Sequence, residues 1–228
     1  KDAESPFIDD SESIKGLQIK NLTFSYPDSA VKVLHNINQD FPNKGLLLIK
    51  GISGSGKSTL LKICTGSLAV SEGTVSVNER DNNWSRQWLK VNSSYMNQFP
   101  FIFDGTLRYN VFLDKHFNEN EPYPHFLNRI LEKKDDGWDT KLSHNGKQLS
   151  GGERQLVTLA RMMLHPRPIA ILDEPTANLD SDTTEIIISE IVKISRERLV
   201  IVASHEQKFE PVADTILNLN WGEKMSYA

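Results

Sequence analysis

The chain has 228 residues, of which 38% are apolar and 25% are charged, ordinary proportions for a globular domain with its own core. No apolar run approaches the roughly 18–20 residues that a membrane helix requires, which excludes a spanning protein but not a fragment of one. The 26 Lys and Arg against 30 Asp and Glu leave a net charge of −4, which gives no electrostatic footprint for a nucleic-acid partner. A single cysteine, Cys64, excludes an internal disulfide and fits a reducing compartment.

Residues 1–16 differ in composition from the rest of the chain. The first 15 positions hold five acids and two lysines, together with one proline and three serines. Such a segment is predicted to be a solvated linker, with a frayed terminus of no function as the alternative. Because the chain begins with Lys1 and has no signal-peptide pattern, we expect an excised piece of a longer protein, folded over residues 17–228.

Strands dominate the predicted elements of the first third of the chain. Residues 17–26 nearly alternate between apolar and polar side chains, which predicts a half-exposed strand. Alternating or turn-bounded segments continue to about residue 77 and are interrupted by one predicted helix over 57–67. Residues 45–50 are short and uniformly apolar, which is typical of a parallel strand covered on both faces.

The later part of the chain alternates between helices and buried strands. Residues 169–172 and 199–203 repeat the uniformly apolar pattern, and helices are predicted over 150–165 and 182–196. Residues from about 105 to 165 lack strand character and are predicted to form a mostly helical insertion. The alternation of strand, helix and strand predicts an α/β fold with a parallel sheet.

The segment Gly51–Ser58 is a complete G-x4-G-K-S phosphate loop, placed after a buried strand and opening a helix. Its glycines let successive N–H groups point inward, and the helix N-terminus adds its dipole. Lys57 would reach the β- and γ-phosphates and the Ser58 hydroxyl would contact Mg²⁺; the alternative is a chance glycine-rich turn. The predicted nucleotide-binding residues here are Gly51, Ser53, Gly54, Ser55, Gly56, Lys57, Ser58 and Thr59.

A pair of acids, Asp173 and Glu174, ends the buried strand over 169–172. A carboxylate at that position can hold the Mg²⁺ hydration shell opposite Ser58, and we assign this role to Asp173. Glu174 is expected to point elsewhere because side chains alternate along a strand, and it can orient and partly deprotonate an attacking water. Alone, such a pair often only caps the next helix; with the phosphate loop upstream it predicts a catalytic site.

The segment Leu149–Glu153 has the sequence LSGGE and opens a predicted helix. Ser150 and Glu153 have the spacing of a capping box, which by itself would explain both residues. A cap does not require two consecutive glycines, which weaken the first turn but let a phosphate approach the bare backbone. At this point the chain resembles the nucleotide-binding domain of ABC transporters, whose signature motif is LSGGQ.

The resemblance covers essentially everything from residue 17 to the end. It implies a P-loop NTPase fold with a RecA-like parallel-sheet core, an antiparallel β subdomain and a helical subdomain over about 100–165. Tyr26 matches the aromatic residue that stacks on adenine, with an ordinary strand aromatic as the alternative. Gln98 matches the glutamine that senses Mg²⁺ and water, and His205 matches the histidine that contacts the γ-phosphate.

The resemblance also implies how the domain works. The cofactors are ATP and Mg²⁺, the cation being held by Ser58, Gln98 and Asp173. Two copies pair head to tail around ATP, so that each nucleotide lies between one phosphate loop and the partner copy's signature segment, with the loop Ala177–Asp180 contacting the opposing copy. The implied catalytic residues are Lys57, Gln98, Glu174 and His205, and the implied signature contacts are Ser150, Gly151 and Gly152.

Two stretches resemble exporters within this family. Residues 103–111 look like the exporter pattern F-x-G-T-[IL]-x-x-N-[IV], and residues 140–149 resemble T-x-V-G-E-x-G-x-x-L. Ser143 and His144 replace the usual Gly and Glu, which removes a carboxylate expected to contact the membrane partner. The implied protein exports a peptide, a lipid or a drug through a membrane domain fused upstream of residues 1–16, with this chain at the cytoplasmic face of the inner membrane.

Three other classes of protein share these motifs. An importer ATPase is disfavoured by the exporter-like stretch and the acidic linker. A chromosome-maintenance ATPase would separate Lys57 from Ser150 by a long coiled coil, whereas only 93 residues separate them here. A non-catalytic regulator would be expected to lose the catalytic glutamate, which is present as Glu174.

The segment after Gln98 contains four large apolar residues around Pro100, namely Phe99, Phe101, Ile102 and Phe103. Proline argues against a central strand, so burial of the whole segment is not expected. We predict that part of it, with residues 140–148, forms a socket for cytoplasmic loops of the membrane domain.

Overall fold

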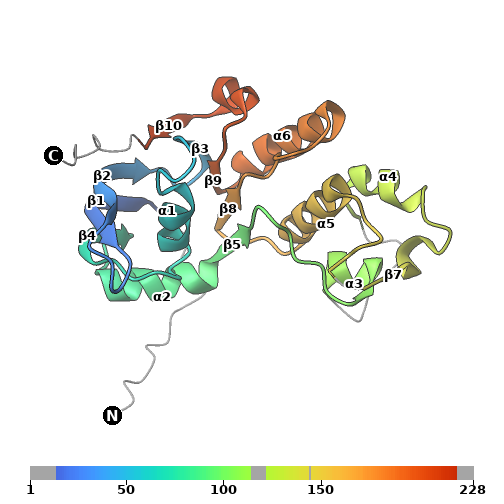
Figure 1. Ribbon diagram of the computed structural model, residues 1–228, viewed down its shortest axis with the longest axis horizontal. Coiled ribbons are helices and arrows are strands. Elements are labelled where there is room, and N and C mark those ends of the chain that lie inside the picture. Colours follow the sequence, from blue (N-terminus) through green and yellow to red (C-terminus); the bar gives the residue numbers. More distant parts are fainter. Residues whose placement is uncertain (1–13, 114–121, 144, 220–228) are drawn as a thin grey trace, which may run out of the picture.

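The structure is a computed structural model that describes residues 14–113, 122–143 and 145–219 (Figure 1). Nearly all of the predicted acidic linker and His144 lie outside these residues. Within the described ranges, no helix combines the length and the apolar character needed to cross a membrane.

A five-stranded sheet forms the centre of the fold, and all of its neighbouring strands are parallel. The three strands predicted from uniformly apolar segments lie side by side in its middle. The two outer strands were not predicted, because their sequences SSYM and TILN have no apolar run. The strand order is β10 (Thr215–Asn218), β3 (Gly45–Lys50), β9 (Leu199–Ala203), β8 (Ile169–Asp173) and β5 (Ser93–Met96).

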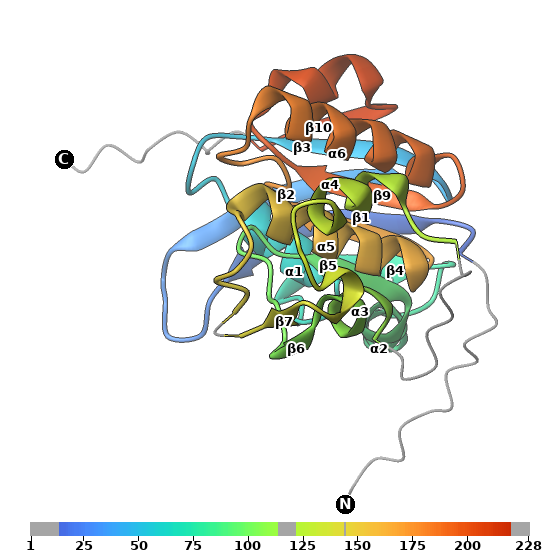
Figure 2. The same cartoon turned by 90° about the vertical axis from the view of Figure 1, so that its right-hand side faces the viewer.

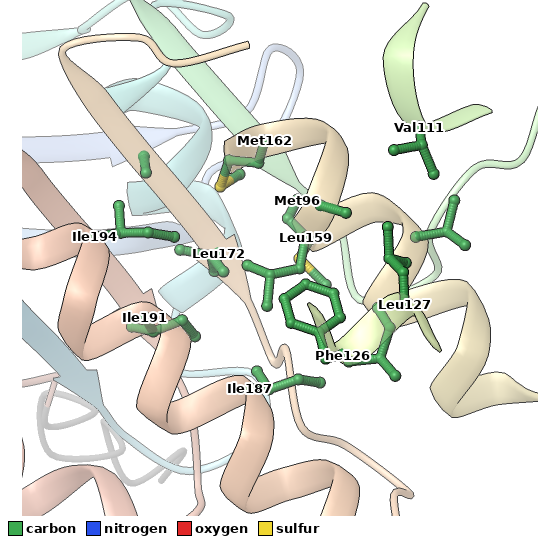
Figure 3. Packing of buried hydrophobic residues seen from close by; sticks show 14 of the residues in the cluster. Met96, Val111, Phe126, Leu127, Leu159, Met162, Leu172, Ile187, Ile191 and Ile194 are labelled. Carbon is green, nitrogen blue, oxygen red and sulfur yellow. The ribbon is translucent and has the colours of Figure 1, made fainter. Parts of the chain in front are cut away.

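Both faces of the parallel sheet are buried. In β3, Leu46 and Leu48 enter one hydrophobic core while Leu47 and Ile49 enter another, and β8 and β9 alternate in the same way. The first core is closed by α5 (Gly151–Leu164) and α6 (Ser181–Ser195), as Figure 3 shows. The second is closed by α1 (Lys57–Cys64). Because both faces of these strands are buried, their sequences are continuous apolar runs.

The first 80 residues form an antiparallel sheet, as predicted. This sheet packs on the second core. Its strand order is β2 (Lys32–Phe41), β1 (Leu17–Ser25) and β4 (Glu72–Val77). Helix α2 (Asn82–Asn92) follows β4 and was not predicted. Asp81 caps it by accepting hydrogen bonds from the first-turn amides, and Trp88 anchors it in the core.

The described residues between 100 and 165 form a largely helical region on one side of the molecule, which faces the viewer in Figure 2. A short strand pair, β6 (Gly105–Thr106) with β7 (Lys141–Leu142), is the exception to the predicted lack of strands. The pair forms because the chain returns beside the start of α3, where Leu107 N–H donates to the Thr140 carbonyl. The helices of this region are α3 (Leu107–Phe112), α4 (Asn128–Leu131) and α5, with 3-10 turns η1 (His125–Leu127) and η2 (Gly137–Asp139). Outside this region, a further 3-10 helix, η3 (Gln207–Val212), precedes β10.

Candidate functional site

Four segments converge at the carboxyl edge of the parallel sheet. The phosphate loop follows β3, Gln98 follows β5, Asp173 ends β8, and His205 follows β9. Because these strands are parallel, their carboxyl ends meet at one edge, where ligands bind in open α/β sheets. A cavity of about 730 Å³ lies there, lined by residues of all four segments.

Most of the predicted site residues line this cavity. They are Ser53, Gly54, Gly56, Lys57, Ser58, Thr59, Gln98, Asp173, Glu174 and His205. Ala177, Asn178 and Leu179 of the predicted intersubunit loop also line it. Sequence reasoning missed four further lining residues, Val33, Thr176, Ser204 and Glu206. Tyr26, Gly51, Ser55, Ser150, Gly151 and Gly152 do not line it.

The phosphate loop has the backbone that its glycines were expected to permit. Gly54 and Gly56 have φ angles of +81° and +95°, in the left-handed region that favours glycine. A Cβ on Gly51 would lie 2.4 Å from the Ser55 hydroxyl oxygen, so Gly51 and Ser55 pack against each other behind the cavity wall. Helix α1 begins at Lys57 with no side chain capping its N-terminus. Its first amides and dipole therefore suit an anion.

Lys57 is held within the cavity wall by backbone carbonyls. Its Nζ donates to the Gly51 oxygen at 2.7 Å and lies 2.8 Å from His205 Nε2 and 3.8 Å from Glu174 Oε1. Burial lowers the pKa of Lys57, while the charges of Glu174 and Asp173 act in the opposite direction. The ammonium is therefore desolvated and positioned to interact with an anionic ligand.

Asp173 ends β8 and is only 5% exposed. Its Oδ2 accepts a hydrogen bond from the Tyr95 hydroxyl at 3.2 Å. Burial, together with the Asp173 charge, raises the pKa of Tyr95 above its usual range, so the hydroxyl is a donor at neutral pH. Sequence reasoning did not single out Tyr95; the parallel register that sets Tyr95 opposite Ile171 brings it within reach of Asp173.

The direction of the Glu174 side chain is set by a turn. The predicted reason, the alternation of side chains along a strand, was wrong. Strand β8 ends at Asp173, and Glu174 has a φ angle of +46°, a left-handed conformation that is costly for a residue with a Cβ. Its carboxylate accepts a hydrogen bond from the His205 backbone N–H at 3.3 Å and lies 3.3 Å from His205 Nε2. This turn places the carboxylate beside Lys57 and His205.

The donor set predicted for Mg²⁺ fits that cation. Ser58, Gln98 and Asp173 line the same cavity and offer hydroxyl, amide and carboxylate oxygens, which are the ligands that Mg²⁺ prefers. Asp173, Glu174 and Glu206 also make the cavity wall acidic. A polyphosphate would therefore bind there more favourably together with a divalent cation.

Tyr26 lies beside the cavity rather than in its lining. Its hydroxyl shares a hydrogen bond with Thr59 Oγ1 at 3.0 Å, and Thr59 does line the cavity. The ring is 38% exposed and packs edge-on against Phe24. An exposed ring next to the phosphate loop is compatible with stacking on a base, and the adenine contact stays a prediction.

The signature segment lies at the start of α5, outside the cavity lining. Ser150 Oγ accepts from the Glu153 backbone N–H while the Glu153 carboxylate accepts from that of Ser150, so the capping box is formed. The cap accounts for Ser150 and Glu153. It does not account for Gly151, because a Cβ there would meet nothing within 4 Å.

The described geometry agrees with what comparison with known proteins finds. The model of the ABC transporter family matches residues 34–177. A probable ABC transporter ATP-binding/permease protein of Haemophilus influenzae is 30% identical over 96% of this chain and 42% of its own length. An ATP-dependent lipid A-core flippase of the same species is 32% identical over 93% of this chain and 38% of its own length.

Further similarities extend the pattern. The glutathione/L-cysteine transport system ATP-binding/permease protein CydD of Bacillus subtilis is 30% identical over 91% of this chain and 37% of its own length. A bacterial Atm1-family ABC exporter, solved with ATP bound, has the same fold with a TM-score of 0.78 at 24% identity, covering 91% of this chain and 37% of the other. The chain thus spans about two fifths of the length of these curated relatives.

Proposed function

The chain belongs to the ABC transporter family as a nucleotide-binding domain, and from that premise we propose that it binds and hydrolyses ATP to power export through a fused transmembrane domain. The observation that carries this is the convergence of the phosphate loop, the Asp173–Glu174 pair and His205 on one cavity. The relatives that it matches combine an ATP-binding part with a permease part. The chain would then act at the cytoplasmic face of the inner membrane.

The proposed chemistry assigns one role to each cavity group. The amides of the phosphate loop and the Lys57 ammonium bind the β- and γ-phosphates and stabilise charge that develops on them. Ser58, Gln98 and Asp173 would hold Mg²⁺, which when bound neutralises phosphate charge. Glu174 accepts a proton from the attacking water. His205, which lies beside Glu174 and Lys57, would contact the γ-phosphate.

The proposed active unit is a pair of identical domains. The signature residues Ser150–Gly152 do not line the chain's own cavity, and the exposed Gly151 leaves backbone accessible at a helix N-terminus. This supports their use at the cavity of a second copy. A head-to-tail pair closes with two-fold symmetry and completes two such sites.

The function is tested by the ATPase activity of the purified chain. We expect phosphate release that requires Mg²⁺, stops on addition of EDTA and returns when Mg²⁺ is restored. Because each site needs a second copy, the rate per chain should rise with protein concentration. Phosphate release that is unaffected by EDTA, or no nucleotide binding at all, would contradict the proposal.

An exposed aromatic surface lies where the docking socket was predicted. Phe99, Phe101 and Phe103 are 76%, 59% and 37% exposed, while Ile102 is buried. The segment has a fixed backbone, because the Asn110 side chain accepts from Phe103 N–H and donates to the Phe103 carbonyl. An exposed apolar surface on a fixed segment marks an interaction site, which supports docking of the membrane domain's cytoplasmic loops.

Two sets of contacts connect the segment Phe99–Phe103 to other parts of the proposed site. Ile102 N–H donates to Asn145 Oδ1, linking it to residues 140–148. Arg161 of α5, the helix that begins at the signature segment, donates to the Phe101 carbonyl and covers the Phe103 ring at 4.9 Å. Movement of the docking surface would therefore be passed to α5.

Replacing Phe99 with serine should separate hydrolysis from transport. Since the ring is mostly exposed, Phe99→Ser should change the ATPase rate of this chain by no more than about twofold. In the full transporter, loss of this apolar contact should lower transport by about tenfold. The control is Val31→Ser, which changes another exposed apolar residue. It should change neither the ATPase rate nor the transport rate. Transport by Phe99→Ser at the rate of the Val31→Ser control would exclude Phe99 from docking.

A further inference from the structure

The hydrogen bond from the Tyr95 hydroxyl to Asp173 Oδ2 has no part in the chemistry proposed above. Tyr95 lies on β5, the outer strand next to β8, and its ring packs against the second hydrophobic core. Since it pairs in register with Ile171, its side chain extends along the strands toward the carboxyl edge. The hydroxyl thus reaches the carboxylate, and Tyr95 itself is not part of the lining of the cavity that Asp173 lines.

The bond occupies one of the two carboxylate oxygens. A carboxylate that is 95% buried requires donors, and the Tyr95 hydroxyl supplies one. With Oδ2 held, rotation of the carboxyl plane is restricted, and the other oxygen remains for a ligand in the cavity. Partners of this kind orient metal-binding carboxylates and contribute to metal affinity.

We propose that Tyr95 is a positioning residue, which orients the Asp173 carboxylate toward the cation that accompanies the bound nucleotide. This inference rests on the proposed function. Tyr95 does not itself touch nucleotide or cation, so its effect should fall on cation affinity rather than on nucleotide affinity. If Tyr95 served only to pack the core, removal of its hydroxyl alone would leave the cation affinity unchanged.

The test uses Tyr95→Phe, which keeps the ring in the core and removes only the hydroxyl. Mn²⁺ replaces Mg²⁺ as a spectroscopic probe, and free Mn²⁺ is measured by electron paramagnetic resonance with saturating non-hydrolysable ATP analogue. Nucleotide affinity in EDTA and the melting temperature are measured in parallel. Tyr123→Phe is the matched control, since it also removes a hydroxyl that donates to a side-chain oxygen, that of Asn128, away from the cavity lining.

We expect Tyr95→Phe to bind Mn²⁺ about tenfold more weakly than wild type, with the nucleotide affinity in EDTA unchanged. The melting temperature should fall slightly, because the buried carboxylate loses a donor. Tyr123→Phe should bind Mn²⁺ like wild type. Equal Mn²⁺ affinity of Tyr95→Phe and wild type overturns the inference and leaves the proposed function intact. A loss of Mn²⁺ affinity and of nucleotide affinity in equal proportion overturns it in favour of a structural role. A wild-type chain that binds no nucleotide overturns the proposed function, and the inference with it.

Discussion

Lys57→Ala will lower the turnover of ATP hydrolysis by about 10²–10³-fold, which leaves almost no measurable activity. The Lys57 ammonium lies in the cavity wall, where backbone carbonyls hold it in place, and in the proposed function it binds the phosphates. Its loss leaves charge on the transferring phosphoryl group without a compensating donor. Nucleotide binding should weaken as well, because Lys57 is proposed to contact the phosphates in the ground state as well as in the transition state.

The experiment compares steady-state hydrolysis and nucleotide binding of Lys57→Ala with those of Lys62→Ala. Lys62 lies on the same helix, α1, but its side chain is exposed, so this control should hydrolyse ATP at the wild-type rate. Lys57→Ala should not lower the melting temperature, because burial already disfavours the charge of Lys57. Turnover by Lys57→Ala within a few fold of that by Lys62→Ala would remove Lys57 from the catalytic site.

Glu174→Gln will slow hydrolysis by about 10²–10⁴-fold while preserving ATP binding. Glutamine keeps the shape and the hydrogen-bond acceptor of the side chain but cannot take a proton from water. Because ATP then persists, pairs of chains should accumulate with ATP and Mg²⁺ and dissociate with ADP. Wild type, purified without the proposed membrane domain, should be largely monomeric, because nothing then raises the local concentration of the two copies.

Light scattering and phosphate release together test this expectation. Glu206→Gln is the control, because it removes the charge of another glutamate that lines the same cavity and should retain most of the activity. Equal losses in the two variants would mean that cavity charge, rather than proton transfer, explains the effect. A Glu174→Gln chain that hydrolyses ATP normally would exclude Glu174 as the general base.

Features that depend on neighbours in sequence could be predicted from the sequence. The phosphate loop follows from glycines and a lysine at fixed spacing, because its backbone conformation is set within eight residues. The cap at Ser150 follows from a serine and a glutamate three positions apart, and the structure forms it. The central strands, such as Gly45–Lys50, follow from unbroken apolar runs, since burial on both faces leaves no polar positions.

Other features were decided only by the tertiary structure. The outer strand Ser93–Met96 has one sheet neighbour and few apolar residues, so its sequence gives no strand signal. The direction of the Glu174 side chain is set by a left-handed backbone conformation at Glu174 itself. No glycine or asparagine at that position indicates this conformation in the sequence. Tyr95 meets Asp173, 78 positions away, because two parallel strands pair in one register. Parallel pairing joins segments that are distant in sequence, so the contacts that orient the carboxylates of the cavity depend on how the whole sheet assembles.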